Sequence, residues 1–323
     1  MKKLIVLLAC LPLACAQAQT KTGAEGYMYQ TVPGWCQLPD GKHYGGTHGS
    51  VVVDQAGKVY ITTDSSFSIM VYSPEGTYLR SFGKEFSGCH GLQIREENGE
   101  EFIYAAHLRG QRAVKLKLDG SMVWELLYPK EANIGGYPKA YKPTGIAVTR
   151  DGSIFVTDGY GTNLIHKYDK DRKYIKTFGG RGEAKDKFKT PHGIAIDARS
   201  GTERLLVCDR EKGRIVYFDL DGNFQEEAVT GLRRPCSVSI QGDLVAVAEL
   251  QARATILDKD NKQVAHLGDN PNKKHWANFG VPPDQWTDGI FTAPHGCGFG
   301  LNGDLFVMDW NKTGRVTKLV PTK

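Results

Sequence analysis

The chain has 323 residues, a formal net charge of +5 and 38 glycines, and 24% of its residues are charged. This length is enough for one large all-β domain, and abundant glycine is expected where many short strands are joined by turns. No basic run is dense enough to indicate a nucleic-acid partner, so we expect none.

Residues 1–18 have the pattern of a secretory signal peptide: a basic start, an apolar stretch over 4–14 and an A-x-A cleavage site at 16–18. The apolar stretch is too short to anchor the chain across a bilayer. A lipoprotein signal at Cys15 is the alternative, but a proline stands three residues before it, where an aliphatic residue is usual. We therefore expect export to the periplasm or the medium, no membrane span, and a single monomeric domain over 19–323.

A short phrase recurs six times along the chain, with 42 to 59 residues from one copy to the next. The copies are Thr47-His48-Gly49, Cys89-His90-Gly91, Pro143-Thr144-Gly145, Pro191-His192-Gly193, Pro235-Cys236-Ser237 and Pro294-His295-Gly296. A period of roughly 40–50 residues with strand-like content is typical of a β-propeller, with one blade per copy. The sequence therefore predicts an all-β, six-bladed β-propeller.

Each copy opens an inner strand, and three further strands follow it. In the first blade we expect strands over 49–54, 59–63, 69–72 and 78–82; in the third over 145–149, 153–158, 164–168 and 174–178; in the fourth over 193–197, 204–209, 214–218 and 223–229. Asp-Gly pairs supply the turns, because glycine adopts positive φ at little cost. No stretch has sustained helical periodicity. The long loops 129–142 and 269–292 are expected to shape one face of the disc.

The last repeat has only three clear strands, over 296–299, 304–308 and 315–320. Residues 27–32 alternate in the manner of a strand. A propeller closes when one terminus completes the blade of the other and so protects an open sheet edge. We therefore expect residues 27–32 to form the outer strand of the sixth blade.

The inner strands of a propeller run along its central channel, so equivalent residues of successive blades form a ring. The ring positions hold His48, His90, Thr144, His192, Cys236 and His295. Neutral imidazoles that converge on one point suit Zn²⁺ or a similar divalent ion, and three protein ligands with one open position is a catalytic pattern. The alternative is that each imidazole bonds a backbone group in the channel wall.

Two residues in loops after second strands are candidates for chemistry. Tyr160 is a candidate general base, because a phenol beside a divalent cation can have its pKa lowered. Arg210 is a candidate for holding a substrate carboxylate. The alternatives are aromatic packing for Tyr160 and an ion pair with Asp209 or Glu211 for Arg210. The carboxylates that end second strands, those of Asp158, Asp209 and Asp309, are expected to accept hydrogen bonds from loop amides.

The mature chain would retain five cysteines: Cys36, Cys89, Cys208, Cys236 and Cys297. An odd number leaves at least one thiol unpaired, and a chain of this size can bury a core without disulfides. We expect small buried apolar side chains rather than a disulfide framework.

At these residues the sequence resembles six-bladed NHL-repeat propellers, in particular the peptidyl-α-hydroxyglycine α-amidating lyase family and its bacterial relatives. The resemblance covers the mature chain and is strongest over 143–219, where Asp158-Gly159-Tyr160, Pro191-His192 and the run from Asp209 to Ile215 carry it. It implies four-stranded blades and an elimination that cleaves the N–Cα bond of a hydroxyglycine, releasing an amide and glyoxylate.

The same resemblance implies a zinc ion on His90, His192 and His295, with Tyr160 as the catalytic base and Arg210 near the substrate. In the family, zinc polarises the α-hydroxyl group and the tyrosinate takes its proton. His48 is an additional imidazole that we also assign to the metal site.

Several positions depart from the family pattern. Asp64 stands where the family has a catalytic arginine, and Arg109 or Arg112 is the candidate to replace it. Gly296 stands where an aspartate contributes to the family's calcium site, so the sequence gives calcium only weak support. His107 stands where the second blade usually has aspartate, and the disulfide cysteines of the family correspond to Gly161, Leu206 and Tyr217.

The residues of the scaffold and of the zinc triad match the family pattern, whereas the departures affect residues expected to recognise the substrate. The sequence therefore predicts an exported zinc-dependent lyase that acts on a small hydroxylated substrate. One alternative is a non-catalytic NHL propeller that binds a protein or glycan. Another is a hydrolase of the lactonase kind, which the histidines at the ring positions argue against, because those sites use Glu, Asn and Asp around calcium.

Overall fold

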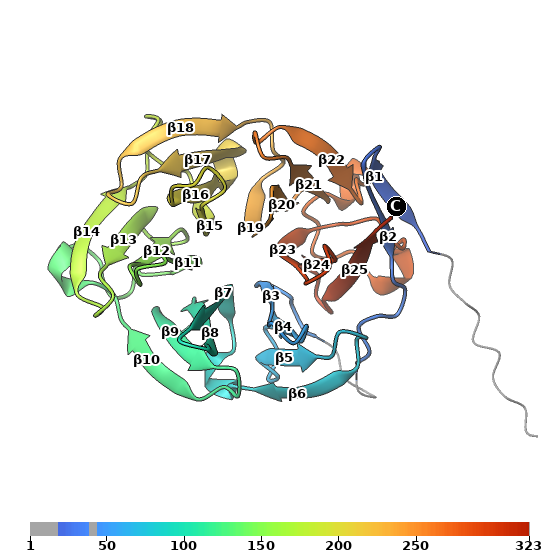
Figure 1. Ribbon diagram of the computed structural model, residues 1–323, viewed down its shortest axis with the longest axis horizontal. Coiled ribbons are helices and arrows are strands. Elements are labelled where there is room, and N and C mark those ends of the chain that lie inside the picture. The colour runs from blue at the N-terminus through green and yellow to red at the C-terminus, as the bar shows by residue number, and fades with distance from the viewer. Residues whose placement is uncertain (1–18, 39–43, 323) are drawn as a thin grey trace, which may run out of the picture.

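The computed structural model describes residues 19–38 and 44–322 and shows six antiparallel sheets arranged as blades around a central axis (Figure 1). The predicted six-bladed β-propeller is confirmed. In the described part of the chain the remaining regular elements are short 3-10 turns: η1 (Lys84–Phe86), η2 (Lys130–Ala132), η3 (Arg210–Lys212), η4 (Lys273–His275) and η5 (Pro283–Gln285).

Each of the first three blades has four strands, numbered outward from the axis in the order of the chain. The first blade consists of β3 (Val51–Val53), β4 (Val59–Thr62), β5 (Ile69–Tyr72) and β6 (Tyr78–Phe82). The second consists of β7 (Cys89–Glu97), β8 (Glu100–His107), β9 (Arg112–Lys117) and β10 (Met122–Leu126). The third consists of β11 (Gly145–Val148), β12 (Ile154–Asp158), β13 (Leu164–Tyr168) and β14 (Tyr174–Gly179).

The fourth and fifth blades repeat this order, and the sixth takes strands from both ends of the chain. The fourth consists of β15 (Pro191–Asp197), β16 (Arg204–Asp209), β17 (Arg214–Phe218) and β18 (Phe224–Val229). The fifth consists of β19 (Pro235–Gln241), β20 (Leu244–Glu249), β21 (Arg253–Leu257) and β22 (Gln263–Leu267). The sixth consists of β23 (Pro294–Phe299), β24 (Leu305–Asp309), β25 (Arg315–Pro321), β2 (Tyr27–Thr31) and β1 (Lys21–Ala24).

The ring closes in the sixth blade, where β2 pairs antiparallel with β25 and places Thr31 opposite Leu319 (Figure 1). The expected closure by residues 27–32 is therefore confirmed. The strand β1 was not expected; it pairs with β2 as a fifth, outermost strand. Thr22 in β1 accepts a hydrogen bond from the amide of Gly268 at 2.7 Å, so β1 also ties the sixth blade to the fifth.

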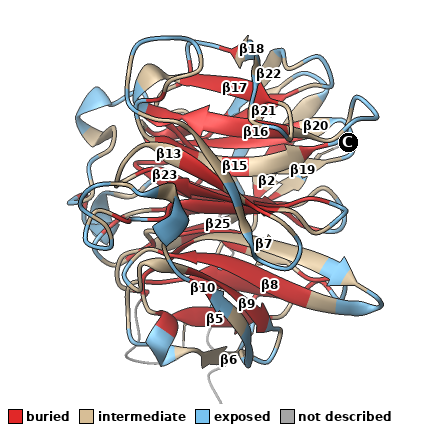
Figure 2. Cartoon of the chain, turned by 90° about the vertical axis from the view of Figure 1, so that its left-hand side faces the viewer, coloured by how far each residue is buried: buried red, intermediate tan, exposed pale blue. Residues whose placement is uncertain are grey.

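The apolar core lies between neighbouring blades rather than inside one sheet. The middle strands have few polar side chains because both of their faces are covered; all five residues of β17, for example, are buried. One cluster joins Tyr60 and Val71 of the first blade to Ile103 and Val114 of the second, and similar clusters fill the other interfaces. Figure 2 shows these buried strands inside the disc and the exposed residues at loops and edges.

Close contact between inner strands depends on glycine at the position after the ring residue. A Cβ atom on Gly193 in β15 would lie 2.7 Å from the carbonyl oxygen of Cys236 in β19. Such a contact is too short for any side chain. Glycine here lets adjacent inner strands approach closely enough for hydrogen bonds to cross between blades.

The predicted signal peptide, residues 1–18, lies outside the described residues. Among the residues that are described, no helix has the length and apolar character needed to cross a bilayer.

Candidate metal centre at the propeller hub

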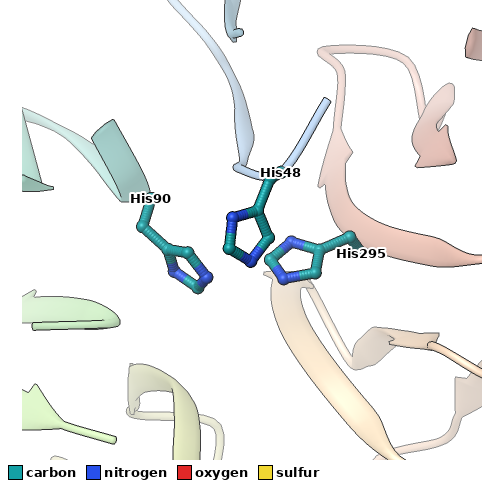
Figure 3. A group of neighbouring side chains, drawn as sticks. All are labelled: His48, His90 and His295. Atoms are coloured by element: carbon teal, nitrogen blue, oxygen red, sulfur yellow. The ribbon is translucent and has the colours of Figure 1, made fainter. Parts of the chain in front are cut away.

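The inner strands bring four imidazoles together at the hub. His90 lies in β7, His192 in β15 and His295 in β23, and their ring centroids are 4.6 to 4.8 Å apart. His48, just before β3, lies 4.7 Å from His90 and 4.6 Å from His295 (Figure 3). The three strand-borne histidines come from the second, fourth and sixth blades, so they surround the axis with approximate threefold symmetry.

Backbone carbonyls of the next blade fix the orientation of these three rings. Nδ1 of His90 lies 2.6 Å from the oxygen of Thr144, Nδ1 of His192 lies 2.7 Å from that of Cys236, and Nδ1 of His295 lies 3.0 Å from that of Gly49. A carbonyl only accepts, so each Nδ1 carries the proton in a neutral ring. Each Nε2 then has a lone pair, which is the arrangement that metal-binding histidines use.

Two of these Nε2 atoms have no hydrogen-bond partner. Those of His90 and His295 are buried and unpaired among the described residues. Buried polar atoms are nearly always satisfied, so such exceptions need an explanation. Converging lone pairs that lack donors are suited to accept a cation. The two stand beside a cavity of about 30 Å³ between the inner strands, which has room for one ion or one water.

Burial keeps the imidazoles neutral. Desolvation lowers the pKa of His90 to about 4 and that of His48 to about 2, and the charge of Arg210 acts in the same direction on both. Desolvation likewise holds the pKa values of His192 and His295 well below the ordinary value, again with help from Arg210. At neutral pH all four rings can therefore receive a cation without first losing a proton.

Tyr160 projects into the same space from the loop that follows β12. Its hydroxyl lies 2.8 Å from Nε2 of His192, 3.0 Å from Nε2 of His48 and 2.9 Å from Nη1 of Arg210, which donates to it. The loop approaches the hub because Gly159 lies against the carbonyl of Pro191, where a Cβ atom would collide. Desolvation raises the pKa of the phenol, and Arg210 opposes that rise, so without a cation Tyr160 is protonated.

Arg210 begins η3 and makes one of the ion pairs that the sequence offered as the alternative to binding a substrate carboxylate. Its Nε bonds Oε1 of Glu211 at 2.9 Å, which is one of the expected structural ion pairs. The same guanidinium faces the hub through Tyr160, with its carbon 5.1 Å from the centre of the phenol ring. Glu211 thus holds a buried cation beside the phenol oxygen.

The residues that end the second strands hold the loops that lead into the hub. Oδ1 of Asp209 accepts from the amide of Lys189 at 2.6 Å, three residues before His192, and Oδ1 of Asp309 accepts from the amide of Ala293 at 2.7 Å. Asp158 accepts from Lys142 and Glu249 from Arg233 in the same way. The expectation that these carboxylates bind loop amides is confirmed.

His107 has the corresponding task in the second blade. Its Nε2 lies 3.1 Å from the carbonyl oxygen of Ser87, three residues before His90. Burial lowers the pKa of His107, so its ring is neutral and can donate one hydrogen bond to that carbonyl. An imidazole here replaces the usual carboxylate and binds the loop carbonyl instead of its amide.

An aromatic wall beside the hub was not found from the sequence. Trp310, directly after β24, stacks on His48 with ring centroids 3.8 Å apart, and Phe279 packs against Trp310 with ring centroids 4.1 Å apart. Phe279 belongs to the loop 269–292, while the amide of Tyr160 donates to Lys142 of the loop 129–142. Both long loops therefore contact the part of the molecule that surrounds the hub.

The hub also contains a sulfur atom. Two donor groups have ligand atoms within 4.8 Å of one another: His48, His90 and His295, and His192, Cys236 and His295. Donors on one tetrahedral zinc ion lie about 3.3–3.6 Å apart, so the members of each group need to approach by about 1 Å on binding. Neither group contains all three of His90, His192 and His295, the triad that the family resemblance implies. Imidazole and thiol donors fit zinc or a similar ion, whereas calcium and magnesium prefer oxygen.

Of the two arginines proposed to replace the family's catalytic arginine, Arg109 lies beside Asp64, the residue at that position of the family pattern. Nη2 of Arg109 is 3.6 Å from Oδ1 of Asp64, and more than half of the Arg109 side chain is exposed. Arg112 instead pairs with Glu125 at 2.6 Å and donates from Nε to His107. The described cysteines are all free, so no disulfide is formed among them.

Comparisons with known proteins agree with the fold and with the family resemblance. A family profile described as a 6-bladed beta-propeller matches residues 143–243. A probable peptidyl-alpha-hydroxyglycine alpha-amidating lyase of Caenorhabditis elegans is 28% identical over 156 residues, which cover 47% of this chain and 43% of that protein. The peptidylglycine alpha-amidating monooxygenase of Rattus norvegicus is 33% identical over 85 residues, 25% of this chain and 8% of that protein.

Solved structures give the same architecture. A streptogramin B lyase superposes with a TM-score of 0.61 at 14% identity, covering 93% of this chain and 98% of that one. A gluconolactonase from Xanthomonas campestris also reaches 0.61, at 13% identity, covering 92% and 90%. Identities this low show the fold alone.

The chain is thus a six-bladed β-propeller, and proteins similar to it include both lyases and a hydrolase. Its sequence is similar to that of the peptidylglycine-amidating enzymes, as predicted, and the chain spans less than half the length of the curated relatives named above.

Proposed function

We propose that this protein is an exported metal-dependent lyase, in which His90, His192 and His295 hold zinc and Tyr160 is the base. The observation that carries the proposal is the convergence of three oriented imidazoles, two with unpaired buried Nε2 atoms, beside one phenol hydroxyl. The similarity to an amidating lyase of Caenorhabditis elegans supports an elimination from a hydroxylated substrate. Residues 1–18 support export.

Zinc, when bound, supplies Lewis acidity that polarises a substrate oxygen. The carbonyl groups bonded to Nδ1 orient the three imidazoles, and burial keeps the rings neutral. Once Nε2 of His192 is engaged, the hydroxyl of Tyr160 keeps its contact with Nε2 of His48, at 3.0 Å, and its proton would leave to solvent, because burial makes the His48 ring resist protonation. Arg210, at 2.9 Å, stabilises the phenolate that results.

Tyr160 then removes the proton of the substrate hydroxyl. The electron pair of that O–H bond becomes the second bond of a new carbonyl, and the bond from carbon to the leaving group breaks. The leaving group departs with its electron pair and takes a proton in turn. With a hydroxyglycine peptide the products are a peptide amide and glyoxylate, so we propose a compound of this chemical type as substrate.

The substrate is expected to be small and to bear a group that suits the wall beside the hub. Trp310 and Phe279 offer an apolar face next to His48, and Arg109 offers an exposed cation near Asp64. An acidic hydroxylated compound with an apolar substituent matches both features. Asp64 would repel a carboxylate placed next to it, so we propose that Arg109 supplies the compensating charge.

The test combines metal content with turnover of a peptide that ends in α-hydroxyglycine. We expect about one zinc per chain in the purified protein and none in the His90→Ala/His192→Ala variant. Tyr160→Phe should retain zinc while glyoxylate release falls by about 10²–10⁴-fold, the usual worth of a general base. Tyr174→Phe, in β14 away from the hub, is the matched control and should remain active.

Unchanged turnover in Tyr160→Phe would remove the base from the mechanism. Stoichiometric zinc without turnover of any hydroxylated compound would instead support the alternative hypothesis, a non-catalytic propeller that binds a protein or glycan and holds a structural metal. The observation that favours this alternative is Asp64, which stands where the lyase pattern has a catalytic arginine.

A further inference from the structure

Cys236 differs from the other described cysteines in where its sulfur points. Cys89, Cys208 and Cys297 are packed in apolar clusters between blades, and Cys36 accepts a hydrogen bond from Tyr44. Cys236 also has apolar neighbours, Leu250 and Ala293, so what sets it apart is its distance from the imidazoles. Cys236 occupies the ring position of the fifth blade, and its Sγ lies within 4.8 Å of a nitrogen of His192 and of His295. The sulfur is therefore part of the hub.

The backbone places this thiol firmly. The carbonyl oxygen of Cys236 accepts from Nδ1 of His192 at 2.7 Å, so the residue that orients one ligand also presents its own side chain to the same space. The carboxylate of Glu249 holds the preceding loop through the amide of Arg233. Glu249 is itself fixed by the guanidinium of Arg253 at 2.8 Å.

Thr144, the equivalent residue of the third blade, shows what a structural ring residue does. Its hydroxyl donates to the carbonyl of Pro191 at 3.0 Å and lies 2.9 Å from the hydroxyl of Thr157. Those contacts use its hydrogen-bonding capacity within the channel wall. The thiol of Cys236 donates a long hydrogen bond, 3.6 Å, to the carbonyl of Arg234, and the guanidinium of Arg210 is a second polar neighbour of its sulfur.

We propose that Cys236 is a further ligand of the hub cation, which it binds as a thiolate together with His192 and His295. This inference rests on the proposed function, because it assumes that the hub holds a metal. It changes the site from imidazole donors alone to imidazole plus sulfur, and a substrate oxygen would then be a fifth donor, which catalytic zinc sites can accept in the transition state. A thiolate favours zinc, cobalt and softer ions over calcium, magnesium and manganese. The thiol proton is released to solvent when the cation binds.

Cobalt(II) tests the inference without reference to activity. The full mature chain is freed of metal with a chelator, and Co²⁺ is added while the visible and near-ultraviolet spectra are recorded. We expect visible bands from the bound ion and, in addition, an intense near-ultraviolet band from sulfur-to-cobalt charge transfer. The second band should be absent from Cys236→Ser and present in Cys297→Ser, whose thiol is equally buried but outside the hub.

Zinc affinity, measured by competition with a chromophoric chelator, gives a second readout. Loss of a partner outside the ligand shell already costs about 10–100-fold in affinity, so Cys236→Ser should bind zinc at least about 10-fold more weakly. Cys297→Ser should bind it as the wild type does. Circular dichroism establishes that each variant is folded.

Bound cobalt without the near-ultraviolet band in the wild type overturns this inference and leaves the proposed function intact. The wild-type spectrum alone decides that point, even if Cys236→Ser does not fold. A band that persists in Cys236→Ser also overturns it. A protein that takes up no cobalt and no zinc overturns both this inference and the proposed function.

Discussion

Acidification of the metal-free protein should remove much of its stability before the carboxylates begin to titrate. The four hub imidazoles have depressed pKa values in the folded state, with His90 at about 4 and His48 at about 2. In the unfolded chain the same rings have a pKa of about 6.5. Between the folded and unfolded pKa values the unfolded state binds more protons than the folded state. The stability that these rings contribute is therefore complete above about pH 6.5, and the free energy of unfolding falls as the pH drops below that value.

The magnitude follows from proton linkage. Each imidazole that stays neutral in the folded state lowers the free energy of unfolding by about 1.3 kcal/mol between pH 7 and pH 5.5, because the same ring becomes protonated in the unfolded chain. His48, His90, His192 and His295 together therefore cost about 5 kcal/mol over this interval. Total stabilities of about 5–15 kcal/mol are usual for domains, so this loss is a large fraction of the whole.

Urea denaturation of chelator-treated protein at pH 7.0, 6.5, 6.0 and 5.5 measures the effect. The variant His90→Asn, whose side-chain amide can still donate to the carbonyl of Thr144, should lose about 1.3 kcal/mol less over the same interval. A decline below about 2 kcal/mol in the wild type would refute the reasoning, because it would mean that the rings are protonated in the folded state or that solvent reaches them.

Three further predictions concern the scaffold, and urea or thermal denaturation checks each of them. Gly193→Ala places a methyl group against the neighbouring inner strand and should cost about 1–3 kcal/mol, whereas Gly135→Ala, with open space around it, should change the stability by under about 0.5 kcal/mol; equal effects would contradict the close-packing argument. Asp209→Asn removes the more buried of the two carboxylates paired with Arg214, 2.9 Å away, while Glu227 stays paired at 2.7 Å, and should cost about 1–3 kcal/mol; a change within experimental error would show that the pair is dispensable. Deletion of residues 19–31 removes β1 and β2 and should abolish the single cooperative transition, because the sixth blade would then expose the edge of β25; an unaltered transition would mean that the closure is not needed.

The sequence was sufficient for the blade count and for the residues of the hub, because both depend on position within a repeat. Once the period is recognised, His90, His192 and His295 have to meet, however far apart they lie in the chain. The closure by residues 27–32 followed from the same reasoning, since a sixth blade with three strands needs a fourth.

Features that depend on contacts between repeats could not be found in this way. Trp310 stacks on His48, and Phe279 reaches Trp310 from a long loop. Trp310 follows Asp309 as Arg210 follows Asp209, but its position in the repeat does not reveal that the ring lies on an imidazole of the first blade. The substitution at His107 was visible in the sequence, but its reason was not, because the acceptor is the carbonyl of Ser87 in the preceding loop. The direction of the Cys236 thiol is likewise set by neighbours outside its own strand.

The hydrogen bond from His295 to the carbonyl of Gly49 joins the last blade to the first. The hub therefore remains incomplete until both ends of the chain have been joined; if the protein is exported, as proposed above, this step follows translocation. An ion that binds at the hub would bind the closed propeller and not chains whose ring is still open, so it would stabilise the closed form. Uptake of metal then reports, in one measurement, that the last step of assembly has taken place.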